Sequence, residues 1–394
     1  MPDQPESRIS ARLERQISAW RDESQFRTLQ IPSGINLCSN DYLGLATDPR
    51  LKQATLEAVA RASAVGSTGS RLMSGNSADW EHLESEFAEF AGTEAALYFG
   101  SGFAANAGLL GAILKPGDVV FSDELNHASL IDGIRLSRAK KVIYPHCDMQ
   151  ALERNLRQHA DAPGARLIVT ESIFSMEGDV APLDSLLRLA RDFRAECIVD
   201  EAHATGTYGA EGRGVAAEQG CQRELLATIH TCGKALASAG GFVCGGSTLR
   251  DFLVNRARTF VFSTAMPPYL AGQIRAALHL AQEAEVDRAH LREMGELLRR
   301  ELTAARLTFG TSSTQIVPIL LGSNDRALHV AAELQKNDYA VKAIRPPTVP
   351  SGTSRIRVSL TKNITRENIS GLVAGLREAI QSAPNPSSAH FVHA

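Results

Sequence analysis

The stretch from residue 196 to residue 246 constrains the fold more than any other part of this 394-residue chain. An apolar run at residues 197–199 ends in Asp200, and His203 follows three residues later. Further along, a second apolar run leads into Thr231 and Lys234. Short runs rich in β-branched residues are typical of buried strands. An acid, a histidine and a lysine are therefore expected just past the carboxyl ends of strands, where open α/β sheets bind ligands.

Each of these residue types has a chemical reason to be there. Lys234 lies between a glycine and an alanine at a strand end, and desolvation there lowers the pKa of an amine and lets it form a Schiff base. Asp200 can keep a pyridine nitrogen protonated, which an electron-sink cofactor requires. His203 can hydrogen-bond a phenolic oxygen, and Thr231 can bond a phosphate. The combination predicts pyridoxal phosphate as the cofactor.

Taken singly, each of these residues also has a structural interpretation. An aspartate after a strand is commonly a loop residue or a helix cap. A lysine is normally a solvated surface charge, and a histidine is usually a satisfied polar residue. All of them together at this spacing in one α/β chain favour the cofactor site.

Two segments give the chain a family resemblance. DEAHATG at residues 200–206, followed by TCGKA at residues 231–235, resembles the α-oxoamine synthases over roughly residues 35–380. These fold-type-I pyridoxal-phosphate enzymes condense an amino acid with an acyl thioester and release carbon dioxide. The resemblance implies an α/β fold with a mainly parallel seven-stranded sheet in a large domain and a smaller α/β C-terminal domain. The expected parts are an N-terminal segment (1–45), the cofactor domain (46–275), the small domain (276–382) and a disordered tail (383–394). Strands are expected in the small domain near residues 315–321, 339–344 and 355–360.

Composition and charge exclude several other classes of protein. The net charge of −3 gives no electrostatic basis for binding nucleic acid or an anionic membrane. Six scattered cysteines without a CxxC pair argue against a zinc site and fit a reducing cytosol. No signal peptide and no membrane-spanning run is expected, which predicts a cytoplasmic enzyme. No metal is expected in the site.

A glycine-rich turn supplies the main alternative from another class. Residues 100–105 (GSGFAA) match the GxGxxG/A pattern of dinucleotide-binding folds, and Asp118 or Asp123 follows at a suitable distance. A nicotinamide-dependent oxidoreductase is thus the distant alternative. This alternative is disfavoured because the glycine-rich turn lies far into the chain, and because a nicotinamide enzyme would give Lys234 no role. Since helix N-termini hold phosphate in both classes, the cofactor phosphate is assigned to Ser101, Gly102 and Phe103.

The resemblance assigns roles to further residues. His127 is expected to stack on the pyridine ring, although a helix-capping histidine is the alternative. Asn40, in the segment SNDYLGL, is expected to reach the substrate, whereas a plain turn would also explain it. Ser175 lies in FSMEGD, which resembles the FSMDGD segment of the family and is expected to hydrogen-bond near the cofactor. Glu171 and Glu177 together would suit a glycosidase, but the turn at residues 178–182 argues against that.

A homodimer with shared active sites is implied by the resemblance alone. The segment STAMPP at residues 263–268 is similar to the STSMPP segment of the family. The hydroxyls of Ser263 and Thr264 are therefore expected to reach the phosphate of the neighbouring subunit.

The choice of substrate is expected to depend on residues 343–358. Arg357 is expected to bind the amino-acid carboxylate, since a planar guanidinium suits bidentate binding. The segment IRPPTVP at residues 344–350 is similar to that of family members that use L-alanine and a pimeloyl thioester. Members that use glycine, such as glycine C-acetyltransferase, usually lack it and remain the near alternative. Arg345 is expected near the far end of the acyl substrate, with Thr348 beside it in the substrate site.

Overall fold

The structure is a computed structural model that describes residues 8–383. The tail predicted at residues 383–394 lies almost entirely outside the described residues. Contacts divide the chain into two units. Unit 2 comprises residues 40–292 and 361–363, and unit 1 comprises residues 1–39, 293–360 and 364–394. The division falls inside one helix, α12 (Glu285–Ala304). The domain boundaries expected from the sequence stay a prediction.

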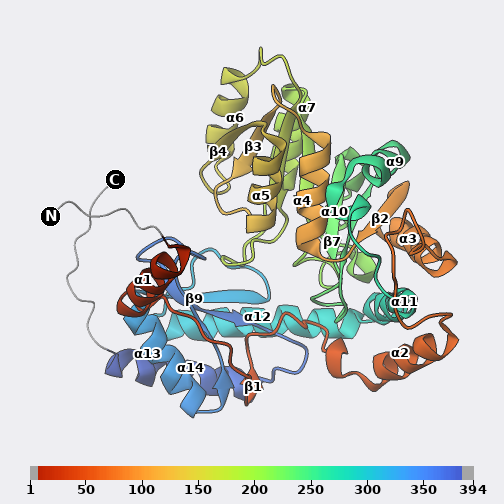
Figure 1. Cartoon of the computed structure of the whole chain (residues 1–394). Coiled ribbons are helices and arrows are strands. Elements are labelled where there is room, and N and C mark those ends of the chain that lie inside the picture. The colour runs from red at the N-terminus through yellow and green to blue at the C-terminus, as the bar shows by residue number, and fades with distance from the viewer. Residues whose placement is uncertain (1–7, 384–394) are drawn as a thin grey trace. The chain divides into compact units, whose positions relative to one another are not determined.

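Unit 2 is built on a seven-stranded sheet (Figure 1) in the order β2-β8-β7-β6-β5-β3-β4. All neighbouring strands are parallel except those that pair with β8, so the predicted mainly parallel sheet is confirmed. The strands are β2 (Ala95–Phe99), β3 (Val119–Asp123), β4 (Lys140–Tyr144), β5 (Arg166–Glu171), β6 (Glu196–Asp200), β7 (Ala227–Thr231) and β8 (Gly241–Gly245).

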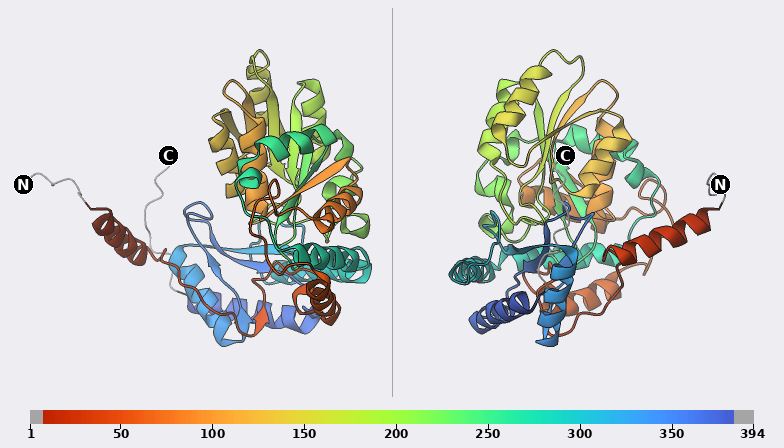
Figure 2. Two further views of the ribbon diagram at one scale, coloured as in Figure 1. Left: turned by 45° about the vertical axis from the view of Figure 1, so that its right-hand side comes forward. Right: turned by 90° about the vertical axis from the view of Figure 1, so that its left-hand side faces the viewer.

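Helices cover both faces of this sheet, and α4 and α6 lie on opposite sides of it (Figure 2). Helices α4, α5, α9 and α10 contribute to one apolar core, while α3, α6 and α7 pack on the other face. The helices of this unit are α2 (Pro49–Arg61), α3 (Ala78–Ala91), α4 (Gly102–Ile113), α5 (Ala128–Ser137), α6 (Met149–Gln158), α7 (Leu183–Asp192), α8 (Val215–Glu218), α9 (Ser247–Arg256), α10 (Arg258–Val261) and α11 (Pro268–Gln282).

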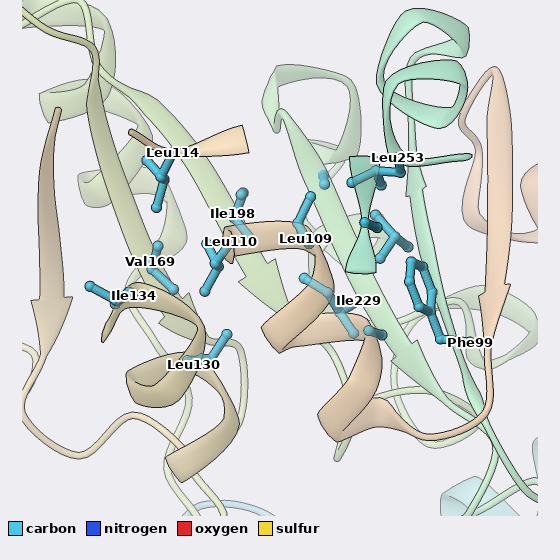
Figure 3. Packing of buried hydrophobic residues seen from close by; sticks show 14 of the residues in the cluster. Phe99, Leu109, Leu110, Leu114, Leu130, Ile134, Val169, Ile198, Ile229 and Leu253 are labelled. Carbon is cyan, nitrogen blue, oxygen red and sulfur yellow. The ribbon is translucent and has the colours of Figure 1, made fainter. Parts of the chain in front are cut away.

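The core between α4 and the sheet explains why the middle of α4 is apolar throughout. Leu109 and Leu110 project from α4 toward Ile198 and Ile229 on the central strands (Figure 3). All four side chains are fully buried. Because parallel strands covered on both faces must be apolar on both faces, their sequences read as continuous runs rather than alternating ones. This packing fixes α4 along the sheet, with Asn106 near its start at the carboxyl end of β6 and Ile113 near the amino ends of β5 and β6.

The turn that matched the dinucleotide pattern lies between β2 and α4, and the topology excludes a dinucleotide-binding unit there. Strand β2 is at the edge of the sheet, next to the antiparallel β8. The following strand, β3, lies at the far side of the sheet rather than beside β2. In a dinucleotide fold the glycine-rich turn follows a central strand, and the next strand pairs in parallel close by.

Unit 1 contains a three-stranded antiparallel sheet in the order β11-β12-β9, with α13 packed on it, and a two-strand parallel pair, β1-β10. One strand predicted near residues 339–344 is wrong. The chain leaves one sheet after Ala340 and joins the other at Ala343, so two short strands replace it. The elements are α1 (Ile9–Asp22), β1 (Ile35–Asn36), β9 (Ile316–Gly322), α13 (Asn324–Lys336), β10 (Tyr339–Ala340), β11 (Ala343–Ile344), β12 (Ser354–Ser359) and α14 (Arg366–Ser382).

Within residues 8–383, no helix combines the length and the apolar character needed to cross a membrane.

Candidate active site

Four of the predicted residues converge at the carboxyl ends of parallel strands in unit 2. Asp200 is the last residue of β6, and Thr231 is the last residue of β7, with Lys234 in the turn that follows. His127 follows β3 and is the N-cap of α5. Because these strands are parallel, their carboxyl ends meet at one edge of the sheet. Electrostatic interactions of His127 with both Asp200 and Lys234 place the three groups in one site.

Asp200 is held in a fixed orientation on both of its oxygens. Its Oδ1 accepts a hydrogen bond of 2.9 Å from the backbone N–H of Ala202, and its Oδ2 accepts one of 2.6 Å from Nδ2 of Asn106. The carboxylate is 4% exposed. A buried carboxylate that accepts two hydrogen bonds and keeps free lone pairs can stabilise a cationic ring nitrogen.

His127 is held through its Nδ1 atom. The backbone N–H of Ser129 donates to this nitrogen at 3.2 Å, and the Ser129 hydroxyl lies 2.7 Å from it. Partial burial lowers the pKa of His127, the Asp200 carboxylate opposes that effect, and Lys234 reinforces it. The imidazole is therefore neutral at pH 7. His127 is exposed, so a ligand can reach it. The helix-cap alternative is also realised, since His127 caps α5.

Glu171 lies beside Asp200, because the two residues are register partners on β5 and β6. Burial, and then the neighbouring Asp200, raise the pKa of Glu171 well above its usual range, while Lys234 opposes this rise. Backbone N–H groups of His127 and Ser175 also bond to its carboxyl group. Glu171 thus ties together the two loops that carry predicted cofactor residues.

His203 is buried and bonded to a residue that the sequence did not single out. Its Nδ1 lies 2.7 Å from the hydroxyl of Tyr42. The same hydroxyl lies 3.2 Å from Oδ1 of Asn40, so the predicted substrate residue Asn40 does belong to this cluster. The Tyr42 hydroxyl thus lies between His203 and Asn40 and fixes the orientation of the His203 ring.

The phosphate site predicted at residues 101–103 is the first turn of α4. The Ser101 side chain caps this helix by accepting from the N–H of Ala104 at 3.0 Å. A Cβ atom on Gly102 would lie 2.4 Å from Cγ2 of Thr231, so only glycine fits against the end of β7. Phe103 is largely exposed at the surface. The N–H groups at a helix start make an anion site. Thr231 faces Gly102 with its methyl group, and its hydroxyl donates to the Ala202 carbonyl oxygen at 3.3 Å.

Ser263 and Thr264 are exposed, directly after the short helix α10. Their segment contacts the Gly/Ser-rich loop at residues 66–76, where the N–H of Ala265 donates to Gly69 at 2.9 Å. An exposed position fits residues expected to serve a neighbouring subunit, which stays a prediction. Ser175 is half-buried in the loop that contacts Glu171.

The three substrate residues predicted in the C-terminal part belong to unit 1. Arg345 follows β11 and donates to the backbone carbonyl oxygens of Ser24 and Phe26. Thr348 accepts a hydrogen bond of 2.9 Å from Arg27. Arg357 is buried in β12, and its Nη1 donates to the Ser359 hydroxyl at 2.6 Å.

Sequence reasoning missed Asn106, Ser129 and Tyr42. In the sequence, Asn106 stands out as a single amide side chain in a helix of mainly small and apolar residues. Ser129 follows the predicted His127 by two residues, the spacing at which a side chain caps a helix. Tyr42 was part of the SNDYLGL segment but received no role.

His146 bridges the two loops beside the site. Its Nδ1 lies 3.0 Å from Asp123 at the end of β3, and its Nε2 lies 3.0 Å from Asp179 in the FSMEGD turn. Each ring nitrogen of His146 faces a carboxylate oxygen, which can only accept a hydrogen bond. Both nitrogens must therefore carry protons. Burial alone would lower the pKa of His146, but the hydrogen bonds with Asp123 and Asp179 outweigh it and raise the pKa to about 12.

Comparison with known proteins agrees with this arrangement. Residues 32–376 match the family model described as aminotransferase class I and II. An 8-amino-7-oxononanoate synthase from Geobacter sulfurreducens is 43% identical over 376 residues, which cover 92% of this chain and 96% of the relative. One from Azoarcus sp. is 45% identical over 346 residues, which cover 88% of each chain.

Solved structures agree with the sequence relatives. The serine palmitoyltransferase of Sphingomonas wittichii has a TM-score of 0.87 at 26% identity and covers 97% of this chain and 100% of its own. The 8-amino-7-oxononanoate synthase of Francisella tularensis has a TM-score of 0.76 at 28% identity, and the match covers 89% of this chain and 98% of that structure. The chain belongs to the class I and II aminotransferase family and, within it, to the 8-amino-7-oxononanoate synthases. The predicted family and fold class are confirmed.

Proposed function

We propose that this protein is an acyltransferase that condenses L-alanine with a pimeloyl thioester, releases carbon dioxide and forms 8-amino-7-oxononanoate for biotin biosynthesis. The observation that carries the proposal is the convergence of Asp200, His127 and Lys234 at one edge of the parallel sheet. The relatives named for this activity cover almost the whole chain.

Pyridoxal phosphate is the cofactor, as predicted from the sequence, and solved serine palmitoyltransferases with matching folds carry it. The residues present fit it: an anion site at the first turn of α4, a fixed carboxylate at Asp200, an exposed imidazole at His127 and an amine at Lys234. When bound, the cofactor supplies an electron sink that stabilises a carbanion at the amino-acid Cα.

The chain's own groups divide the remaining work. Lys234 would hold the cofactor through its amine and would accept the Cα proton of the bound alanine. Asp200 would stabilise a positive charge on the ring nitrogen of the cofactor. His203, whose Nδ1 lies 2.7 Å from the Tyr42 hydroxyl, would bond the phenolic oxygen of the cofactor and would polarise the acylated substrate as it loses carbon dioxide. A carbon–carbon bond would form between Cα and the thioester carbonyl carbon as the carbon–sulfur bond breaks and the thiolate leaves. Loss of the amino-acid carboxyl group as carbon dioxide and return of a proton to Cα would complete the product.

We assign the far carboxylate of the pimeloyl group to a cavity of about 560 Å³ in unit 1. Arg27, Lys342 and Arg345 line this cavity, and the lining residues include no carboxylate. Burial and the neighbouring Arg27 lower the pKa of Arg345. Two guanidinium groups close together without an acidic partner favour binding of a carboxylate. Arg357 is assigned to the amino-acid carboxylate, and Asn40 and Thr348 to substrate binding.

A homodimer with shared active sites is the proposed assembly. Large apolar side chains at Leu72, Met73, Phe103 and Phe262 are exposed in the loops around the α4 turn and the Ser263 segment. Exposed apolar groups gathered near a polar site are typical of a protein interface. Light scattering should give twice the monomer mass, and Met73→Glu should shift the protein toward monomer. A cytoplasmic location is proposed with it, because all six cysteines are free thiols.

The activity is tested by incubating the purified protein with L-alanine and pimeloyl-CoA. We expect equimolar release of free thiol and 8-amino-7-oxononanoate, detected by mass spectrometry. Glycine with acetyl-CoA is the matched control for the near alternative, glycine C-acetyltransferase. Turnover of that pair in preference to alanine would keep the chemistry and overturn the substrate.

A further inference from the structure

Asn106 is a polar residue in the buried face of α4. It is 1% exposed, and its neighbours in the helix are alanine, glycine and leucine. A buried amide is retained only where it has partners, because an unbonded polar group in the core is unfavourable. The Nδ2 atom of Asn106 has two partners: Oδ2 of Asp200 at 2.6 Å and Oγ of Ser129 at 2.9 Å.

The chemistry of these partners fixes the direction of every hydrogen bond. An ionised carboxylate only accepts, so the amide nitrogen of Asn106 must face Asp200. The second N–H of that nitrogen is donated to the Ser129 oxygen. The hydroxyl proton of Ser129 is therefore available for Nδ1 of His127, 2.7 Å away.

A second, independent donor agrees with this direction. The backbone N–H of Ser129 also points at Nδ1 of His127, at 3.2 Å. A backbone N–H can only donate, so Nδ1 must be an acceptor. The single proton of the neutral ring then lies on Nε2.

We propose that Asn106 and Ser129 are positioning residues that connect Asp200 to His127 and hold His127 as the neutral tautomer protonated at Nε2. The inference rests on the proposed function, in which Asp200 and His127 contact the cofactor. A second proton, added at Nδ1 while Nε2 keeps its own, would put a positive charge on the His127 ring, against the positive charge that Asp200 would stabilise on the cofactor. The chain of hydrogen bonds thus keeps one positive charge, rather than two, in the site.

The geometry of α4 strengthens the connection. Gly102 and Asn106 are four residues apart and therefore share one face of the helix. Gly102 packs against Thr231 at the end of β7, and Asn106 reaches Asp200 at the end of β6. One rigid helix face therefore serves both the phosphate site and the hydrogen-bond chain. The Oδ1 atom of Asn106 is buried with no hydrogen-bond partner among residues 8–383, which is unfavourable for a residue with only a structural role.

The test uses Ser129→Ala, which removes the hydroxyl but keeps the backbone donor. The control is Ser137→Ala, a buried serine in the same helix whose hydroxyl donates to the Ile134 carbonyl at 2.6 Å. The first readout is the ¹⁵N NMR signal of the His127 ring nitrogens over a pH titration, assigned with His127→Asn. The second is the pH at which the absorption band of the bound cofactor titrates, together with kcat and KM for L-alanine.

In the wild type we expect an unprotonated Nδ1 at pH 7. Ser129→Ala should raise the pKa of His127 toward its ordinary value, shift the cofactor titration and lower kcat about tenfold with little change in KM. Ser129→Thr, which restores the hydroxyl, should recover most of the loss, and Ser137→Ala should change none of these readouts.

Two results would overturn the proposal: a His127 protonated at Nδ1 in the wild type, or equal effects of Ser129→Ala and Ser137→Ala. The NMR readout is also recorded without cofactor, which separates the two hypotheses. A protein that binds no pyridoxal phosphate but shows the Nε2 tautomer would refute the proposed function and leave the positioning role standing.

Discussion

Replacing His146 by alanine should destabilise the protein most at slightly acidic pH and less at alkaline pH. The ring bridges Asp123 and Asp179, and its side chain is only 17% exposed. Removing one partner of a buried ion pair typically costs about 3–5 kcal/mol, because the remaining charge is left uncompensated. We expect a loss in this range in the free energy of unfolding at pH 6.

The pH dependence follows from the direction of the pKa shift. The pKa of His146 is raised to about 12 in the folded chain, and an unfolded histidine titrates near 6.5. The stabilisation is therefore fully present below about pH 6.5 and is lost as the pH rises through the folded pKa. Where only the folded chain holds the proton, the slope is about 1.4 kcal/mol per pH unit. Between pH 7 and pH 9 the penalty of His146→Ala should shrink by about 2–3 kcal/mol.

The assay is urea unfolding of the wild type and His146→Ala at pH 6, 7, 8 and 9. Asp179→Asn should flatten the dependence, because it removes one of the two carboxylates that hold the proton. His82→Ala, a change at an exposed position on α3, is the control and should cost little at any pH. A penalty for His146→Ala that is constant with pH, or that grows toward pH 9, would refute a protonated His146 bridge.

Three further changes test the packing around the site. Arg71→Ala should lower the free energy of unfolding, measured in urea, by about 3–5 kcal/mol, because Arg71 forms a buried ion pair with Glu84 through two hydrogen bonds of 2.9 and 3.0 Å. A loss below about 1 kcal/mol would contradict this. Gly102→Ala should lower the free energy of unfolding by about 1–3 kcal/mol and weaken pyridoxal-phosphate binding in a fluorescence titration, since the new Cβ would overlap Thr231. Unchanged affinity would show that the helix start is not the phosphate site. Leu109→Ala should lower the unfolding free energy by about 2–5 kcal/mol without moving the cofactor affinity, and a specific loss of affinity would refute its purely structural role.

The sequence predicted the parts of the site that follow from strand ends and short motifs. Asp200, Thr231 and Lys234 were found because a buried parallel strand reads as a continuous apolar run and its end is polar. His127 and Asn40 came from resemblance to the family, since each also suits an ordinary turn or cap.

The contacts that the sequence did not reveal depend on tertiary structure. The Asn106 partners Asp200 and Ser129 come from different elements, and no local pattern brings them together. His146 was missed for the same reason, because its two carboxylates lie on the end of β3 and on a loop that are far apart in the sequence. The division of residues 339–344 between two sheets was missed because pairing partners, rather than local propensity, decide where a short strand ends.

The central claim is that Lys234 carries pyridoxal phosphate for a reaction of L-alanine. The most direct measurement is the absorption spectrum of the purified protein, before and after addition of L-alanine or glycine and then of pimeloyl-CoA, with Lys234→Ala as the comparison. We expect a yellow protein whose band shifts with L-alanine in preference to glycine and shifts again with pimeloyl-CoA, and a folded but inactive Lys234→Ala. A protein that stays colourless after addition of pyridoxal phosphate, or a fully active Lys234→Ala, would contradict the account.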